Sequence, residues 1–129
     1  MHNEGQITLS VLHDLALLYL GLAHGADGSL DPAETKEIAL KLREWQPHKD
    51  PALIDHVLRD ATMTYLNGGS DDLQEVVVSL KDLLDDEVRL SILHDLNDIA
   101  HADGKVNTGE SSFVNHLAEV WDVNYKEQA

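Results

Sequence analysis

The spacing of apolar residues restricts the fold of this chain more than any other feature of its sequence. Ile38, Leu42 and Trp45 follow one another at intervals of four and three residues, and the segments 76–83 and 113–120 repeat this spacing. Such intervals place the side chains on one face of an α-helix. No segment alternates apolar and polar residues over the length that a strand requires. The pattern predicts an all-α fold.

Helix start and stop signals divide the chain into six predicted helices. Asp50-Pro51 is typical of an N-cap followed by proline at the first helical position, and Gly68-Gly69 is typical of a helix end. The first helix is the most apolar, so we expect it to be the most buried. The predicted helices span residues 7–25, 32–46, 51–67, 71–84, 87–102 and 108–122. A chain of 129 residues suffices for one domain, which predicts a single-domain bundle over residues 1–129 with about six to seven helices.

A short sequence word occurs twice in the chain. Residues 23–38 read AHGADGSLDPAETKEI, and residues 100–114 read AHADGKVNTGESSFV. A shift of 76 residues aligns the two ADG words and also places Trp45 on Trp121. The shared register predicts an internal helix-loop-helix repeat whose two copies are related by a pseudo-twofold axis. The two tryptophans end matched apolar stripes and are predicted to lie in the core.

The repeated loops carry oxygen-bearing side chains at matching positions. Asp31 and Asn107 suit helix N-caps, and the glutamates three residues after them suit capping boxes, so helix capping alone would explain these four residues. Capping explains the aspartates of the ADG words less well. If the two loops face each other, six such side chains would meet, and that number suits a hard divalent cation. The six candidate ligands are Asp27, Asp31, Glu34, Asp103, Asn107 and Glu110.

A complete EF-hand is excluded. Aligning Gly28 with the invariant glycine of that calcium loop leaves Ala23 and Gly25 at its first and third ligand positions, where no side-chain oxygen is available. The shared site is instead predicted to hold calcium or magnesium. Zinc becomes the alternative if His24 or His101 takes part, because imidazole is a softer ligand than carboxylate.

The paired ADG words, each followed by an apolar residue and a helix that opens with glutamate, resemble the tellurite-resistance TerB family. They also resemble the N-terminal domain of the DjlA co-chaperone. The resemblance extends from about Leu9 to Val123. It implies an all-helical domain with a pseudo-twofold repeat and an acidic cluster for a divalent metal. It also implies a role in bacterial tellurite and stress resistance, beside calcium-binding and membrane-associated partner proteins. The family's acidic positions fall on Asp27, Asp31, Glu34, Asp103 and Glu110, whereas Asn107 departs from a carboxylate and weakens the second loop as a ligand set.

Two His-Asp dipeptides support an alternative function. His13-Asp14 and His94-Asp95 are similar to the dyad of metal-dependent phosphohydrolases, which are also all-helical, and Asp98 is a further candidate. Random placement of the eight histidines among many aspartates would give a similar number of such dipeptides. The chain has no phosphate-binding glycine loop and no nucleophile elbow. A non-catalytic domain is therefore favoured over a hydrolase.

Charge and composition restrict the partners and the location. Nine basic residues against 24 acidic ones give a net charge of −15 at pH 7, and the basic residues are scattered. This charge disfavours nucleic acid and favours cations or basic proteins. The longest apolar run, residues 15–23, is shorter than the about 20 residues that cross a bilayer, so no membrane insertion is expected. The N-terminal residues lack the features of a secretory signal and the chain has no cysteine, which together predict a cytoplasmic protein.

Overall fold

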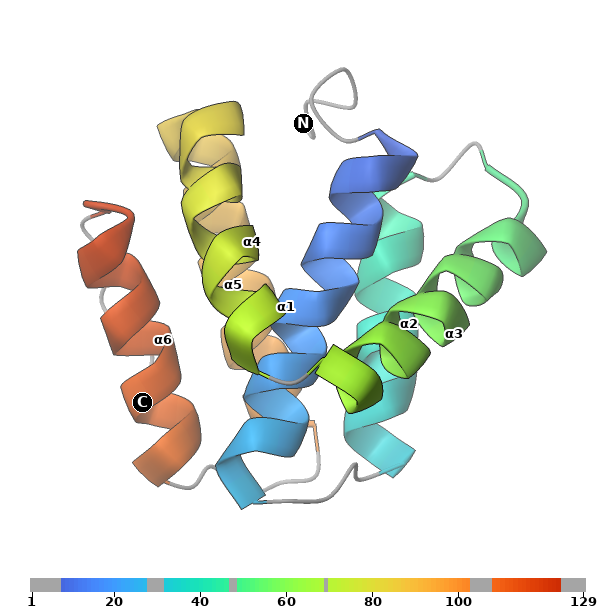
Figure 1. Cartoon of the computed structure of the whole chain (residues 1–129), viewed down its shortest axis with the longest axis horizontal. Coiled ribbons are helices and arrows are strands. Elements are labelled where there is room, and N and C mark those ends of the chain that lie inside the picture. The colour runs from blue at the N-terminus through green and yellow to red at the C-terminus, as the bar shows by residue number, and fades with distance from the viewer. Residues whose placement is uncertain (1–7, 28–31, 47–48, 69, 103–107, 124–129) are drawn as a thin grey trace.

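The computed structural model of the chain describes residues 8–27, 32–46, 49–68, 70–102 and 108–123 (Figure 1). Its helices are α1 (Leu9–Asp27), α2 (Pro32–Trp45), α3 (Pro51–Gly68), α4 (Ser70–Leu83), α5 (Asp86–Ala100) and α6 (Thr108–Val120). Within these ranges no strand occurs, and no helix has the length and apolar character needed to span a membrane. The predicted all-α fold is confirmed, and every helix boundary lies within two residues of its predicted position.

Local capping explains where several helices begin. The Asp50 carboxylate accepts a hydrogen bond of 2.9 Å from the Ala52 amide, and Pro51 is the first residue of α3. In the same way Asp85 caps α5, because its carboxylate accepts a hydrogen bond of 2.9 Å from the amide of Val88. These side chains pair with backbone amides that have no partner inside the helix. Helix starts therefore depend on a few neighbouring residues of the sequence.

Helix α1 is the centre of the bundle, as its apolar sequence predicted. It contacts all five other helices, with α2 and α3 on one side and α4, α5 and α6 on the other (Figure 1). Leu12, Leu15, Leu18 and Leu22 are fully buried. At Gly21 a β-carbon would come within 2.6 Å of a methyl group of Leu73 on α4, so the glycine permits close packing of α4 on α1.

The helix contacts fall into two matching pairs. Helix α1 packs on α2 as α5 packs on α6, and α1 contacts α6 as α5 contacts α2. Tyr19 and Asp95 are 76 residues apart, which is the offset of the repeat, and they share a hydrogen bond of 2.8 Å. A pseudo-twofold axis would bring such positions together, and the internal repeat itself stays a prediction.

The two matched tryptophans are both buried, as predicted, but their hydrogen bonds differ. Trp45 and Trp121 are 1% and 0% exposed. The indole of Trp45 donates to Tyr19 and Asp95, whereas that of Trp121 donates to the carbonyl of Val77 at 2.9 Å. Their surroundings are therefore not identical, and superposition of the two halves stays a prediction.

Arg89 joins the end of α4 to the turn that follows α6. Its guanidinium donates to the carbonyls of Leu84 and Lys81, both at 2.9 Å, and to that of Trp121 at 3.4 Å. It also pairs with Asp86 at 2.8 Å. One planar group thus satisfies several carbonyls that the helix ends leave without an internal partner.

Arg89→Lys is expected to lower the free energy of unfolding by about 1–2 kcal/mol, because a single ammonium cannot reproduce the fork of donors. Urea unfolding followed by circular dichroism measures the change. Arg59→Lys, on the exposed surface of α3, is the matched control and should change stability by less than about 0.5 kcal/mol. Equal losses in the two variants would show that the contacts of Arg89 do not stabilise the fold.

Candidate functional site

The helix ends that border the two repeated loops lie at the same end of the molecule (Figure 1). Helix α1 ends at Asp27 and α2 begins at Pro32, while α5 ends at Ala100 and α6 begins at Thr108. These helices also pack on one another, since α1 contacts the other three and α5 contacts both α2 and α6. The hypothesis that the two loops form a shared site requires this arrangement.

Five of the six candidate ligands fall where the structure describes no side chain. Asp27 and Glu110 belong to helices α1 and α6, but only their backbone is described. Asp31, Asp103 and Asn107 lie outside the described residues. Among the side chains that are described, no three His, Cys, Asp or Glu residues are grouped so that they could hold a metal. The predicted ligand set stays a prediction.

Glu34 is the candidate ligand whose side chain is described. It lies in the first turn of α2 and is only 1% exposed. A buried carboxylate is costly unless its charge is compensated, and the amino end of α2 contributes a favourable potential. Glu34 therefore places a buried carboxyl group close to the helix ends that border the loops.

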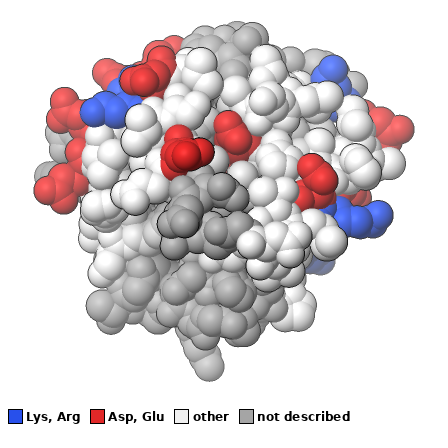
Figure 2. Space-filling model, in the orientation of Figure 1, with Lys and Arg blue, Asp and Glu red and all other residues white. Residues whose placement is uncertain are grey.

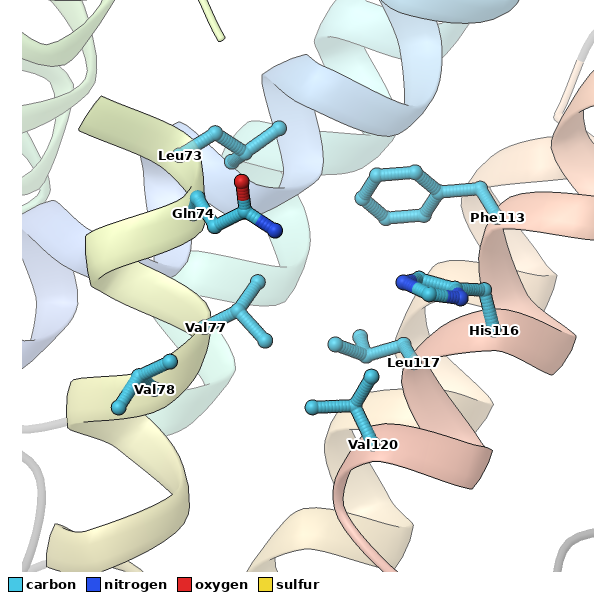
Figure 3. Close-up of a pocket in the computed structure, with 8 residues that line it drawn as sticks. All are labelled: Leu73, Gln74, Val77, Val78, Phe113, His116, Leu117 and Val120. Atoms are coloured by element: carbon cyan, nitrogen blue, oxygen red, sulfur yellow. The ribbon is translucent and has the colours of Figure 1, made fainter. Parts of the chain in front are cut away.

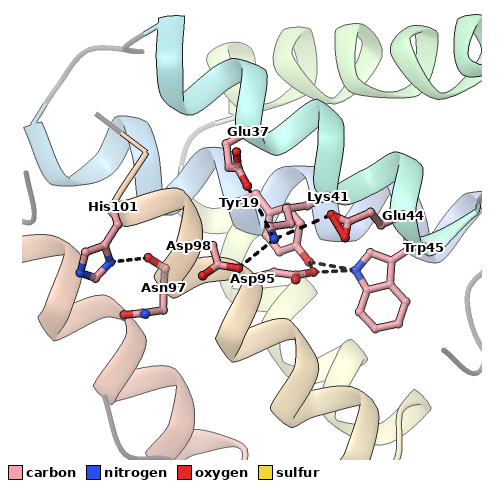
Figure 4. Close-up of polar contacts among 9 residues, drawn as sticks. All are labelled: Tyr19, Glu37, Lys41, Glu44, Trp45, Asp95, Asn97, Asp98 and His101. Carbon is pink, nitrogen blue, oxygen red and sulfur yellow. Dashed lines mark hydrogen bonds and ion pairs between the residues drawn. The ribbon is translucent and has the colours of Figure 1, made fainter. Parts of the chain in front are cut away.

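His101 lies in the turn that follows α5 and its side chain is exposed. Its Nδ1 is 2.7 Å from the backbone carbonyl of Asn97 (Figure 4 shows both residues). A carbonyl only accepts, so Nδ1 is the donor of this hydrogen bond and a metal would have to bind at Nε2. A metal-binding histidine commonly has this orientation. The side chain of His24, the other candidate, is not described.

A polar cluster joins the three helices α1, α2 and α5 (Figure 4). Asp95 of α5 accepts hydrogen bonds of 2.8 Å from the hydroxyl of Tyr19 and from the indole Nε1 of Trp45. The same indole nitrogen is 3.2 Å from the Tyr19 oxygen. Because each residue comes from a different helix, these bonds set how α2 and α5 lie against α1.

The surroundings of Asp95 raise the pKa of its carboxyl group. Burial raises the pKa of its carboxyl to about 6, against the opposing effects of the hydrogen bonds from Tyr19 and Trp45 and of the Lys41 charge. Burial and the nearby Asp95 charge also raise the pKa of Tyr19 well above its ordinary value. At neutral pH the cluster therefore holds one negative charge on Asp95 while the Tyr19 hydroxyl remains a donor.

Lys41 connects α2 to α5 beside this cluster. Its ammonium is 2.8 Å from the Asp98 carboxylate of α5, 3.6 Å from Glu37 and 3.8 Å from Glu44. Burial lowers the pKa of Lys41, but the hydrogen bond to Asp98 and the surrounding carboxylates outweigh it, and the net pKa is raised. Lys41 thus remains charged and stabilises the packing of two helices that border the loops.

The residues of the hydrolase alternative have different surroundings. His13 pairs with Asp60 of α3 at 3.1 Å, and it borders, with Asp14, a cavity of about 380 Å³. Burial raises the pKa of Asp14, although the charge of His13 opposes this. In the second dipeptide His94 is exposed, whereas the Asp95 carboxylate belongs to the polar cluster.

The polar cluster was not predicted from the sequence, although one feature of the sequence indicates it. Asp95 falls between Ile92 and Ile99 on the buried face of α5, beside Leu96. A carboxylate within an apolar stripe requires buried donors, because its burial is otherwise too costly. The sequence does not indicate that Tyr19 and Trp45, which lie far away along the chain, are those donors.

Comparisons with known proteins agree with this fold. The family model described as tellurite resistance protein TerB matches residues 14–129. Among solved structures, a protein of unknown function from Porphyromonas gingivalis is similar, with a TM-score of 0.70 and 14% identity over 94% of this chain and 89% of that chain. At this identity the likeness shows a shared fold alone. No curated protein matches the chain.

Proposed function

The chain belongs to the TerB family of tellurite resistance proteins, and from this membership we propose that it is a non-catalytic domain that binds a divalent cation between its two ADG loops. Its role is that of an interaction module in bacterial stress and tellurite resistance, acting in the cytoplasm with other resistance proteins.

The arrangement of the helix ends supports this proposal most directly. Helices α1 and α5 end beside the two loops and α2 and α6 begin beside them, so four helix ends that border the candidate ligands lie at one end of the molecule. The buried Glu34 adds a carboxyl group to the same region. Oxygen ligands from carboxylates suit calcium or magnesium, and participation of the imidazole of His101 would favour zinc instead.

The polar cluster favours a non-catalytic domain over a phosphohydrolase. Asp95 and Asp98, two carboxylates of the hydrolase alternative, already bind donors that hold helices together. The cavity beside His13 and Asp14 supports the alternative. Metal-dependent hydrolysis of a generic phosphoester that disappears in His13→Ala or His94→Ala would establish the hydrolase and refute the non-catalytic proposal.

Added calcium or magnesium is expected to raise the melting temperature of the wild type, and Asp27→Asn with Asp103→Asn should remove most of this gain. Asparagine keeps the turn preference of aspartate while two negative charges disappear. Free cation at 100 times its dissociation constant would stabilise the folded protein by about 2.7 kcal/mol. Thermal unfolding in chelator and in a series of calcium, magnesium, manganese and zinc concentrations measures the effect.

Asp82→Asn with Glu119→Gln is the matched control. It removes the same number of charges from exposed positions near the carboxyl ends of α4 and α6, at the opposite end of the molecule. This variant should keep the cation-dependent shift. An unchanged shift in the Asp27 and Asp103 variant, or no shift in the wild type with any of the four metals, would refute the proposed site.

A further inference from the structure

An apolar groove separates α4 from α6 (Figure 3). Both helices pack on α1 and run in the same direction, with a cavity of about 250 Å³ between them (Figures 1 and 3). Apolar side chains from both helices line most of it, and Val78 at its edge is 55% exposed. The apolar lining residues are Leu73, Val77, Val78, Phe113, Leu117 and Val120.

The lining residues form two ridges with helical spacing. Leu73 and Val77 are four residues apart on α4, and Phe113, Leu117 and Val120 have the equivalent spacing on α6. Two such ridges on neighbouring helices leave a groove into which the apolar face of another helix fits. The geometry therefore suits a helix better than an extended strand, which would need an unpaired sheet edge.

Two contacts fix the position of α4 beside the groove. Leu73 rests against Gly21 of α1, and the indole of Trp121 donates to the backbone carbonyl of Val77 at 2.9 Å. The second bond ties the turn after α6 to the middle of α4. A preformed groove of this kind loses little conformational freedom when it binds a partner.

The charges at one end of the groove are mostly acidic. Helices α4 and α6 both end there, and α5 begins there (Figure 1). Figure 2 shows Asp and Glu side chains gathered over this region, at the upper left of the view. Of its basic residues, Lys81 is half-buried and Arg89 is paired with Asp86. The exposed acidic residues are Asp82, Asp85, Asp86, Glu87, Glu119 and Asp122.

We propose that this α4–α6 groove binds an amphipathic helix of a partner protein that carries Lys or Arg residues beside its apolar face. The apolar face covers the two ridges, and the basic residues lie next to the acidic end of the groove. The acidic end lies opposite the end of the molecule where α1 and α5 end and α2 and α6 begin, so this proposal does not depend on the proposed cation binding (Figure 1).

Binding of a basic amphipathic peptide tests the proposal. The probe is a fluorescent helical peptide made of two copies of Leu-Lys-Lys-Leu-Leu-Lys-Leu, and its anisotropy is measured in the presence of chelator. Val78→Lys should weaken binding by about tenfold or more, because it places a charge in the apolar contact and repels the peptide. Leu66→Lys on α3 is the matched control, since Leu66 is 58% exposed and lies outside the groove, and it should leave the affinity unchanged.

The charge requirement has its own test. Asp82→Asn with Glu119→Gln should weaken peptide binding and reduce its dependence on salt, because two acidic partners of the peptide disappear. A peptide with glutamate in place of every lysine should not bind. The proposal is refuted if no basic peptide binds, if the acidic peptide binds equally well, or if Leu66→Lys and Val78→Lys have the same effect. It is also refuted if sedimentation shows that a second copy of the chain occupies the groove.

Discussion

Trp45→Ala is expected to lower the free energy of unfolding by about 3–5 kcal/mol, because the substitution leaves a cavity at a fully packed position. Trp45 is 1% exposed, and its indole donates to Asp95 at 2.8 Å and to Tyr19 at 3.2 Å. The loss removes buried apolar area and a donor to a buried carboxylate together. A domain of this size has a total stability of about 5–15 kcal/mol, so a large part of it would be lost. Urea unfolding followed by circular dichroism gives the value.

Trp45→Phe separates packing from hydrogen bonding. Phenylalanine keeps an aromatic ring in the core but cannot donate to Asp95, so the expected loss is about 1–2 kcal/mol. Trp121→Phe removes a different bond, to the carbonyl of Val77, and provides the comparison at the matched position of the repeat. A loss below about 1 kcal/mol in Trp45→Ala would contradict a central role of Trp45 in the core.

The stability of the wild type, measured relative to Asp95→Asn, is expected to fall by about 3 kcal/mol between about pH 4 and pH 7. Burial raises the pKa of Asp95 from its ordinary 3.8 to about 6 in the folded protein. The folded state therefore binds this proton more tightly than the unfolded state does. The resulting stability is fully present below about pH 4 and is lost as the pH rises through about 6. Denaturant unfolding of both proteins across this range measures the difference.

Tyr19→Phe provides a second test of the same cluster. The hydrogen bond from Tyr19 lowers the pKa of Asp95, so its removal should raise that pKa further and extend the loss of stability to higher pH. In the background of Asp95→Asn the same substitution should have no pH-dependent effect. A stability difference between wild type and Asp95→Asn that does not change with pH would show that the Asp95 carboxylate is not buried.

Much of the architecture was predictable because it depends on short stretches of sequence. Helix positions follow from apolar spacing and from caps such as Asp50 and Asp85, which act within three residues of their own position. The central place of α1 follows from an apolar surface too broad for one-sided packing. The repeated ADG words predicted that the two loops occupy related positions, which stays a prediction, and the helix ends that border the loops lie at the same end of the molecule.

Other properties depend on residues that only the folded chain brings together. The donors to Asp95 lie 76 and 50 residues away along the sequence, and the sequence alone does not pair them. The same holds for the burial of Glu34 and for the groove between α4 and α6, whose two ridges no third helix covers within the described part of the chain. By itself the sequence determined the six helices, the apolar core and the candidate ligands, because spacing and capping act over one or two helical turns. Only the tertiary structure decided which carboxylates lose water and which apolar face stays open, because both depend on how distant helices pack.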